Sequence, residues 1–358
     1  MTDGTRGQAT VDRAESGQGG AGHRPAAVRR AILIGSRAEP WIRGLVLAAL
    51  GLLLGLLMLL HAKIPNRPGN LGSLVETFLP WSGLGIAVLL AGALRRRSAS
   101  ATAALLLPVV VWVHLFGGRF ADRSHPGADL TVAGHNVGAA NPDPAGTARD
   151  LAASGADVLA LEELTPQATG TYEKELAKTY PYHVVLGTVG LWSRLPLSDT
   201  RPIDIMNYGP LAETIPAGEK TAPNRALRTT VTTNRGPLAV YVAHLGSVRV
   251  NPRAGFWTAS RNIGVQALGR AVAAEKITRV VLLGDLNGTV DDRALAAVTG
   301  QLRSAQDAAG DGFGFTWPAS FPVVRADEIL VRGVEPDSSW VLPATGSDHL
   351  PVAAGISW

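Results

Sequence analysis

Hydrophobic residues gather in three long runs in the first third of the chain. The first run, Gly44 to Ala62, reads GLVLAALGLLLGLLMLLHA and has no formally charged residue. As a helix rising 1.5 Å per residue, it could cross a hydrocarbon core about 30 Å thick. Weaker runs extend from about Leu71 to Leu94, where Glu76 interrupts the front half, and from about Ala99 to Gly117. The pattern predicts three transmembrane helices within residues 41–118.

Two other interpretations of these runs remain open. The first run could be a buried core helix, and the two weaker runs could form a re-entrant hairpin. The residues before them, 1–40, are rich in Gly, Ala, Thr, Arg and Asp and lack apolar periodicity. Such a composition cannot bury enough apolar surface to fold, so we expect a disordered cytoplasmic tail.

Basic residues flank the apolar runs and predict their orientation. Arginines cluster before the first run, and Arg95, Arg96 and Arg97 fill the short turn between the second and third. Short loops rich in Lys and Arg stay in the cytoplasm. With an odd number of spans, everything after residue 118 lies outside the cell. The expected localisation is a multi-pass protein of the cell membrane with an extracellular catalytic domain.

From about residue 125 the pattern changes to short β-like runs that alternate with helical stretches. Several consecutive strands have no helix between them, which indicates an α/β domain with mixed, layered sheets over residues 125–358. The expected strands are 130–133, 158–161, 183–186, 238–243, 279–283 and 328–331, and the expected helices are 145–154, 166–178 and 253–276.

Charge and cysteine content exclude some functions. The formal net charge is +4, and much of the basic excess flanks the apolar runs, so it gives little support to nucleic-acid binding. The chain has no cysteine, which excludes disulfides, thiolate nucleophiles and zinc–thiolate sites.

The most informative polar motif is Gly284-Asp285-Leu286-Asn287, which follows an apolar strand. It presents a carboxylate and an amide two residues apart, on the same side if the chain stays extended. Hard oxygen ligands of this kind suit Mg²⁺ or Mn²⁺, and phosphate-ester hydrolysis needs such a cation. An ordinary strand followed by an Asp/Asn turn is the alternative.

Other acids and histidines stand at expected strand ends. Asp348 and His349 are adjacent, so they point to opposite faces, and His349 is a natural general base near neutral pH. Glu163 ends an apolar strand and could bind metal, or be part of an acidic pair at a helix N-terminus. Asn136 and His244 end two further strands, and Asp327 precedes another and could orient a histidine.

Together these motifs resemble the endonuclease/exonuclease/phosphatase superfamily over roughly residues 129–358. The resemblance implies a four-layered α/β sandwich, with two sheets inside and helices outside, after the three transmembrane helices. Seven family motifs appear in order, namely Asn136, Leu161-Glu162-Glu163, Ser193-Arg194-Leu195-Pro196, His244-Leu245, Gly284 to Asn287, Asp327 to Leu330 and Ser347-Asp348-His349.

The resemblance also implies roles for these residues. Metal ligands would be Glu163, Asn136 and Asp348, with Mg²⁺ or Mn²⁺ as cofactor. Catalysis would rest on His349 as the base for water, on its orienting partner Asp327, and on three residues that contact phosphate or water, namely Asp285, Asn287 and His244. Substrate would be bound by Asn136, His244 and Asn287.

Three positions depart from the family pattern. Glu162 stands where Gln is common, Glu328 stands where His or Tyr is frequent, and Gly138 stands where apurinic endonucleases carry an acid. The last departure argues against a close abasic-site endonuclease. The first two concern neighbours of the catalytic groups and leave the expected catalytic core intact.

Apolar runs before such a domain also resemble the membrane-anchored actinobacterial teicoplanin-resistance (VanJ-type) proteins. An active site beside a bilayer sees lipid headgroups at high effective concentration. We therefore expect the lipid bilayer as a partner and a lipid-linked phosphate or diphosphate as the substrate, with a contribution to glycopeptide resistance. The alternatives are an extracellular nuclease and an inactive surface protein that binds lipid or antibiotic. Nothing in the sequence sets the oligomeric state.

Overall fold

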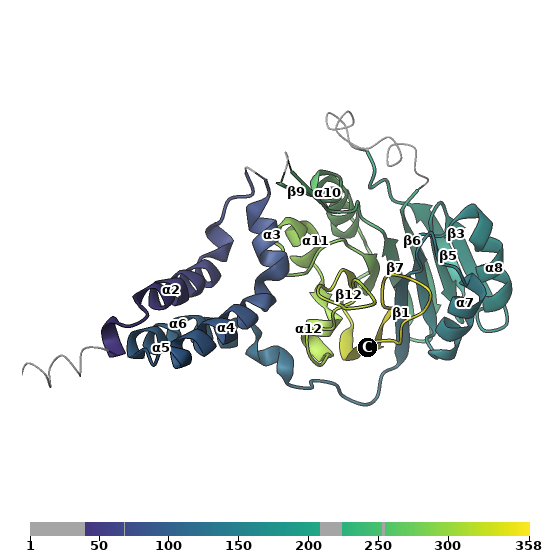
Figure 1. Cartoon of the computed structure of the whole chain (residues 1–358). Coiled ribbons are helices and arrows are strands. Elements are labelled where there is room, and N and C mark those ends of the chain that lie inside the picture. The colour runs from purple at the N-terminus through teal and green to yellow at the C-terminus, as the bar shows by residue number, and fades with distance from the viewer. Residues whose placement is uncertain (1–39, 68, 208–223, 253–254) are drawn as a thin grey trace, which may run out of the picture.

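The computed structural model describes residues 40–67, 69–207, 224–252 and 255–358. They form an α/β body and a helical arm that extends from one side of it (Figure 1). The tail predicted to be disordered lies outside the described residues, except for Pro40.

Two six-stranded mixed sheets form the centre of the body. The first sheet has the order β13 (Glu335–Val341), β14 (Val352–Ser357), β1 (Leu130–Asn136), β2 (Val158–Glu162), β4 (Val189–Ser193) and β3 (Tyr182–Leu186). The second has the order β11 (Arg303–Ser304), β12 (Asp327–Arg332), β10 (Val280–Asp285), β7 (Gly236–Ala243), β6 (Ala226–Thr233) and β5 (Leu197–Pro202). The pairs β1–β2 and β7–β10 are parallel, and the other neighbours are antiparallel.

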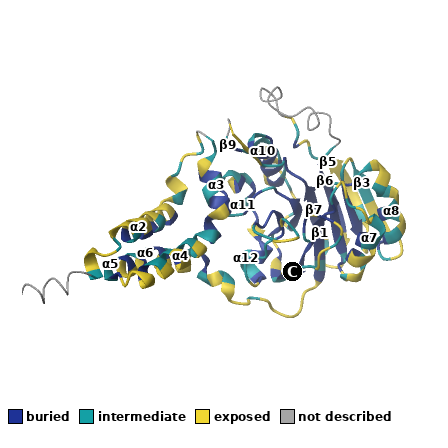
Figure 2. Cartoon of the chain, in the orientation of Figure 1, coloured by how far each residue is buried: buried dark blue, intermediate teal, exposed yellow. Residues whose placement is uncertain are grey.

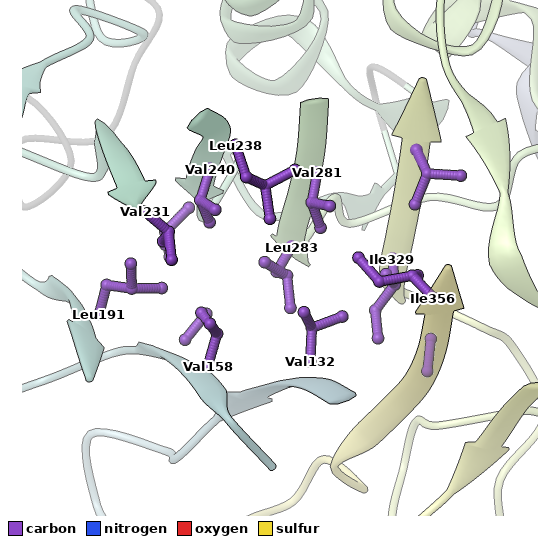
Figure 3. Close-up of a cluster of buried hydrophobic side chains, with 14 of the residues drawn as sticks. Val132, Val158, Leu191, Val231, Leu238, Val240, Val281, Leu283, Ile329 and Ile356 are labelled. Carbon is purple, nitrogen blue, oxygen red and sulfur yellow. The ribbon is translucent and has the colours of Figure 1, made fainter. Parts of the chain in front are cut away.

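The facing sides of the sheets enclose the main hydrophobic core. Val132, Val158, Val240 and Leu283 are fully buried there, among β-branched and leucine side chains from both sheets (Figure 3). β-Branched residues suit this position because they pack well on a pleated surface. The core fixes how the two sheets face one another.

Helices cover the outer face of each sheet. On the first sheet, α7 (Pro144–Ala153) and α8 (Pro166–Leu176) pack through Leu151 and Tyr172. On the second, α10 (Ala259–Ala273) and α11 (Ala296–Thr299) pack through Val265 and Val298. The predicted α/β sandwich with two mixed sheets and flanking helices is confirmed. Shorter elements in the same body are η5 (Arg293–Leu295) and α12 (Ala305–Ala309).

The predicted start of the long helix at residue 253 is wrong. Residues Gly255–Trp257 form strand β9, which pairs with β8 (Arg249–Asn251), and the helix begins at Ala259 after Thr258. Gly255 has a φ of +71° and lies so close to Gly69 that a Cβ there would meet its backbone at 2.7 Å. This close contact with the arm supports a strand pair that local sequence could not indicate.

The arm contains the apolar helices α2 (Leu45–Leu59), α4 (Ser82–Arg95), α5 (Ala99–Ala104) and α6 (Leu106–Phe116). Helix α3 (Leu71–Phe78) lies between the arm and the body (Figure 1). Many apolar side chains of the arm are exposed, with Val46 at 74%, Val88 at 64% and Val110 at 65% (Figure 2). The helical arm also contains three short 3₁₀ turns, namely η1 (His61–Lys63), η2 (Leu79–Trp81) and η3 (Gly117–Phe120).

The expected number of long apolar helices is corrected by the structure. Within the described residues, two stretches are long and apolar enough to cross a membrane, Leu71–Arg95 and Ala99–Phe120. The helix in the first run has only 15 residues, bounded by left-handed Gly44 and the 3₁₀ turn at His61. At 1.5 Å per residue it is about 22 Å long, which is shorter than a typical hydrocarbon core.

Candidate active site

One edge of the paired sheets carries the polar residues singled out in the sequence. Strands β1, β2, β7 and β10 end there, and β12 and β14 begin there. The antiparallel register of β10 and β12 places Asp327 opposite Asp285, and the parallel register of β1 and β2 places Asn136 opposite Glu162. The fold therefore brings together residues that lie far apart in the chain, such as Asn136 and Asp327.

Asn136 connects two carboxylates at the centre of this edge. Its Nδ2 atom lies 3.2 Å from Oε1 of Glu163 and 3.0 Å from Oδ2 of Asp285. Asn136 and Asp285 are each 1% exposed. Burial and the nearby charge of Asp327 raise the pKa of Asp285 to about 7. The carboxylates are thus crowded in a poorly solvated place, which a cation would stabilise.

These residues fit a hard divalent cation. Glu163 and Asp285 supply the carboxylate oxygens that Mg²⁺ and Mn²⁺ prefer. The amide oxygen of Asn136 accepts the N–H of Gly138 at 3.1 Å, so the amide would have to turn over to bind the cation. A second tight group, Asp285, Asp327 and His349, has ligand atoms within 4.8 Å of one another. In that group His349 and Asp327 already hydrogen-bond each other, so the Glu163 side is the better cation site.

The Gly284–Asn287 turn holds Asp285 and Asn287 together. Gly284 has a φ of +151°, and a Cβ there would clash with the carbonyl of Ala243. The Asn287 backbone N–H donates to Oδ1 of Asp285 at 2.8 Å, and Asn287 Nδ2 lies 3.2 Å from Asp285 Oδ2. The two side chains share one side as predicted, through a turn at Asn287 (φ +49°) and not through extended chain.

Glu163 also has a left-handed backbone, with a φ of +59°. This conformation is uncommon for a residue with a long side chain and costs about 1–3 kcal/mol. It turns Glu163 away from the direction of strand β2, so that Oε2 accepts the N–H of Ala139 at 2.9 Å. Two strained residues, Glu163 and Asn287, therefore flank the same cluster, which is typical of functional sites.

His349 and Asp327 form a buried hydrogen-bonded pair at 2.8 Å between Nδ1 and Oδ2. Burial by itself would lower the pKa of His349. The bond to Asp327 and the charges of Asp327, Asp285 and Asp348 outweigh burial and raise the pKa to about 10. The other ring nitrogen, Nε2, lies 3.8 Å from Oδ2 of Asp285 and so faces the carboxylate cluster.

Asp348 points elsewhere than His349, as predicted, although residues 346–349 form a bend and not an extended strand. Its Oδ2 accepts the indole N–H of Trp317 at 3.3 Å, and the residue is exposed. The main chain around it is fixed, because the Asp348 carbonyl accepts the N–H of Ala319. The contacts give Asp348 no bond to Glu163 or Asn136, so its predicted role as a metal ligand stays a prediction.

His244 lies on the opposite side of the cluster. Its Nε2 atom is 3.6 Å from Glu163 Oε1 and 3.6 Å from Asp285 Oδ2, and 2.6 Å from Nη2 of Arg225. Burial and the positive charge of Arg225 lower the pKa of His244 well below its usual value. His244 is therefore a neutral imidazole beside a buried guanidinium, a pair that suits an anionic phosphate.

A cavity of about 280 Å³ adjoins these groups. Glu163 and His244 line one part of it, and Arg225 and Arg249 line another. The hydroxyl groups of Thr165, Thr188 and Ser247 contribute polar lining.

Arg225 was missed by sequence reasoning. The signal was present, because Asn224-Arg225 directly precedes an alternating strand that pairs with the strand ending at His244.

Three more ionisable groups are buried near the cluster. Glu162 is fully buried, and burial together with the charges of Asp327 and Asp285 raises its pKa well above its usual value. Burial also raises the pKa of Glu328 to about 7, and lowers the pKa of His135 to about 3. Burial therefore favours the neutral form of the Glu162 carboxyl.

A family model and several solved structures match this chain. The model, described as "Endonuclease/Exonuclease/phosphatase family", matches residues 133–349. No curated protein sequence matches the chain.

Solved structures share the fold at low identity. An endonuclease/exonuclease/phosphatase from Beutenbergia cavernae is 19% identical, with a TM-score of 0.52 over 64% of this chain and 72% of its own. D. rerio TDP2 complexed with a single-strand DNA product is 20% identical, with a TM-score of 0.51 over 64% of this chain and 99% of its own. A Bacteroides vulgatus protein titled endonuclease/exonuclease/phosphatase is 15% identical, with a TM-score of 0.51 over 64% of this chain and 98% of its own.

Proposed function

This chain belongs to the endonuclease/exonuclease/phosphatase family, and from that premise we propose that it is a membrane-anchored, metal-dependent phosphoesterase. It hydrolyses phosphate ester or diphosphate bonds, with a lipid-linked phosphate as substrate. One observation carries the enzymatic part of the proposal. Glu163, Asp285 and the Asp327–His349 pair converge at one edge of the two sheets.

Glu163 and Asn136 hold the divalent cation in this proposal, with Asp285 beside them and Asp348 as a further acid. When bound, such a cation neutralises phosphate oxygens and the charge that develops in the transition state. A cation held there would also lessen the negative charge around His349. Because the bond to Asp327 and the nearby carboxylate charges raise the pKa of His349, the ring would then reach the neutral form at lower pH.

The neutral His349 accepts a proton from water, whose oxygen attacks phosphorus while the bond to the leaving oxygen breaks. Asp327 holds Nδ1 of the ring, so Nε2 is the atom that takes the proton. Asp285 and Asn287 contact the water and the attacked phosphate. Arg225, whose Nη2 donates to Nε2 of the neutral His244, lies beside that ring where it would contact a phosphate oxygen together with His244.

The apolar arm supports membrane anchoring. Its large exposed hydrophobic residues extend over helices α2, α4 and α6, including Leu53, Leu84 and Val110 (Figure 2). A contiguous apolar surface of this kind is unfavourable in water and marks a membrane or partner surface. The two stretches long enough to cross a membrane, Leu71–Arg95 and Ala99–Phe120, pack against the shorter apolar helix α2, which supports a membrane anchor.

The distribution of basic residues supports an extracellular active site. Arg95, Arg96 and Arg97 follow α4 at the tip of the arm, far from the body, and the N-terminus of α2 lies beside them through a bond from Ser98 to the Arg43 carbonyl (Figure 1). Basic residues favour the cytoplasmic side. The body at the other end of the arm then lies outside the cell.

The substrate follows from this placement. An active site held beside a bilayer meets lipid-linked phosphates at high effective concentration. Arg225 and Arg249 line the cavity beside Glu163, where they would favour a strongly anionic headgroup such as a diphosphate.

Purified full-length protein in detergent tests the proposal. Phosphate release from a prenyl diphosphate, a phospholipid monophosphate, an inositol phosphate and single-stranded DNA is measured with Mg²⁺ and with EDTA. The proposal predicts Mg²⁺-dependent turnover, fastest on the lipid-linked substrates. DNA cleavage without lipid turnover would identify a nuclease, and binding without turnover would identify a surface binder.

A role in glycopeptide resistance rests only on the resemblance to VanJ-type proteins. To test this role, wild type and Glu163→Ala are expressed in a sensitive host, and the inhibitory concentration of teicoplanin is measured. If the protein acts as an enzyme, Glu163→Ala abolishes the resistance, whereas a protein that only binds would keep it.

A further inference from the structure

Helix α3 turns two polar residues toward the catalytic body. Ser73 is fully buried and Glu76 is 1% exposed. The hydroxyl of Ser73 donates to Oδ1 of Asp292 at 2.9 Å, across 219 positions of the chain. The bond links the base of the arm to the segment that follows the Gly284–Asn287 turn.

Asp292 is in turn paired with Arg261 of helix α10. The distance from Arg261 Nη2 to Asp292 Oδ2 is 2.6 Å, and both residues are fully buried. A buried ion pair needs close geometry to offset the cost of taking two charges out of water. None of the catalytic roles described above uses this pair.

Arg261 reaches the active site with its other terminal nitrogen. Its Nη1 donates to the backbone carbonyl of Asn287 at 3.1 Å. The guanidinium needs the space beside Gly288, where a Cβ would meet Nη1 at 2.6 Å. A larger residue at position 288 would displace the bond.

Asn287 depends on such a bond because its backbone is strained, with a φ of +49°. Its side chain bonds the Leu245 carbonyl at 3.0 Å and Asp285 Oδ2 at 3.2 Å. Holding the carbonyl of Asn287 therefore helps to fix the direction of its side-chain amide, which bonds Asp285. A strained backbone conformation persists only where several surrounding contacts hold it in place.

We propose that Ser73, Asp292 and Arg261 are positioning residues that connect the membrane arm to Asn287, so that the seating of helix α3 sets the orientation of the catalytic amide. The inference rests on the proposed function, since it concerns the role of Asn287 in that reaction. This positioning role differs from attachment of the arm to the catalytic body, which other contacts provide.

The contacts that attach the arm to the body involve residues other than Ser73, Asp292 and Arg261. Arg293 pairs with Glu76 at 2.9 Å and donates to the carbonyls of His61 and Ala62. Trp81 donates to the carbonyl of Val323 at 2.8 Å. Because these contacts remain when the Ser73 hydroxyl is removed, a docking role and a positioning role can be separated.

The test compares Ser73→Ala with Thr77→Val in full-length protein, using bis(p-nitrophenyl) phosphate and Mg²⁺. Thr77 is the matched control, because its buried hydroxyl bonds only the Ser73 carbonyl within the same helix at 2.8 Å. We expect Ser73→Ala to lower kcat about three- to tenfold, with KM and Tm close to those of Thr77→Val. Arg261→Lys keeps the charge but cannot make both bonds of the guanidinium, so we expect kcat to fall with KM unchanged, together with a lower Tm because the buried ion pair is weakened.

Equal kcat in Ser73→Ala, Thr77→Val and wild type would overturn the inference. So would a loss that affects KM and Tm as much as kcat. If Ser73→Ala cannot be purified, the kcat and KM of Arg261→Lys decide instead. Absence of any turnover by the wild type on every phosphate ester would instead contradict the proposed function, so the two failures are distinguishable.

Discussion

The Nδ1 atom of His349 lies 2.8 Å from Oδ2 of Asp327, while Nε2 of the same ring faces Oδ2 of Asp285 at 3.8 Å. Asp327 thus fixes both the direction and the charge of the ring. We predict that Asp327→Asn lowers kcat/KM about 10- to 100-fold. Because Asp327 raises the pKa of His349, its removal lowers that pKa, and the acidic limb of the kcat/KM profile shifts to lower pH.

A pH series of kcat/KM measures this shift. Glu335→Gln is the control, since Glu335 is an exposed partner of Arg303. A profile of Asp327→Asn that keeps the wild-type acidic limb would contradict the role of Asp327.

Replacement of Glu162 by Gln tests whether this buried acid is neutral. Burial raises its pKa in the folded state, so the folded protein holds a proton that the unfolded chain releases above about pH 4.5. The loss of folding stability that this retained proton causes is absent below about pH 4.5 and grows as pH rises. We predict that Glu162→Gln raises the Tm by a few degrees at pH 8 and leaves it unchanged at pH 4, measured in EDTA. A lower Tm at pH 8 would show that the wild-type carboxylate is charged and stabilised.

Leu283 tests the core between the two sheets. The side chain is fully buried among residues of both sheets. We predict that Leu283→Ala lowers the free energy of unfolding by about 2–5 kcal/mol, through lost burial and the cavity left behind. Val250→Ala is the control, because Val250 is 82% exposed. Denaturant unfolding of both variants checks this, and equal losses would show that the sheets do not share a tight core.

Arg225 tests the phosphate side of the site. Its guanidinium contacts His244 at 2.6 Å and lines the cavity beside Glu163. We predict that Arg225→Gln raises KM about tenfold, the loss expected for one hydrogen bond to a charged group, with a smaller change in kcat. Steady-state kinetics of Arg225→Gln and of the exposed control Arg149→Gln measure the difference. A fall in kcat with unchanged KM would assign Arg225 to the transition state instead.

Much of the body could be predicted because its signals are local. The apolar strands before Asn136, Glu163 and Asp285 are short runs bounded by polar turns. Each predicted run lies in a strand, except that Arg279 precedes β10. Their convergence could be expected only through the family resemblance, because register and sheet order depend on contacts far apart in the chain.

What the sequence did not reveal depends on packing between distant segments. Strand β9 replaces the expected start of a helix because Gly255 packs on Gly69. Glu76 was read as a weak point of a membrane span, whereas it is buried against Arg293 of the body. The Arg261–Asp292 pair gave no local signal, since neither residue belongs to a motif.

Metal-dependent hydrolysis of a lipid-linked phosphate is the most direct test of the central claim. Wild type and Glu163→Gln are assayed on a prenyl diphosphate in EDTA, and again after addition of Mg²⁺ or Mn²⁺. The account predicts wild-type turnover only with the metal, and a loss of about 100-fold or more in Glu163→Gln. Full wild-type activity in EDTA, or equal activity of the two proteins with Mg²⁺, would contradict it.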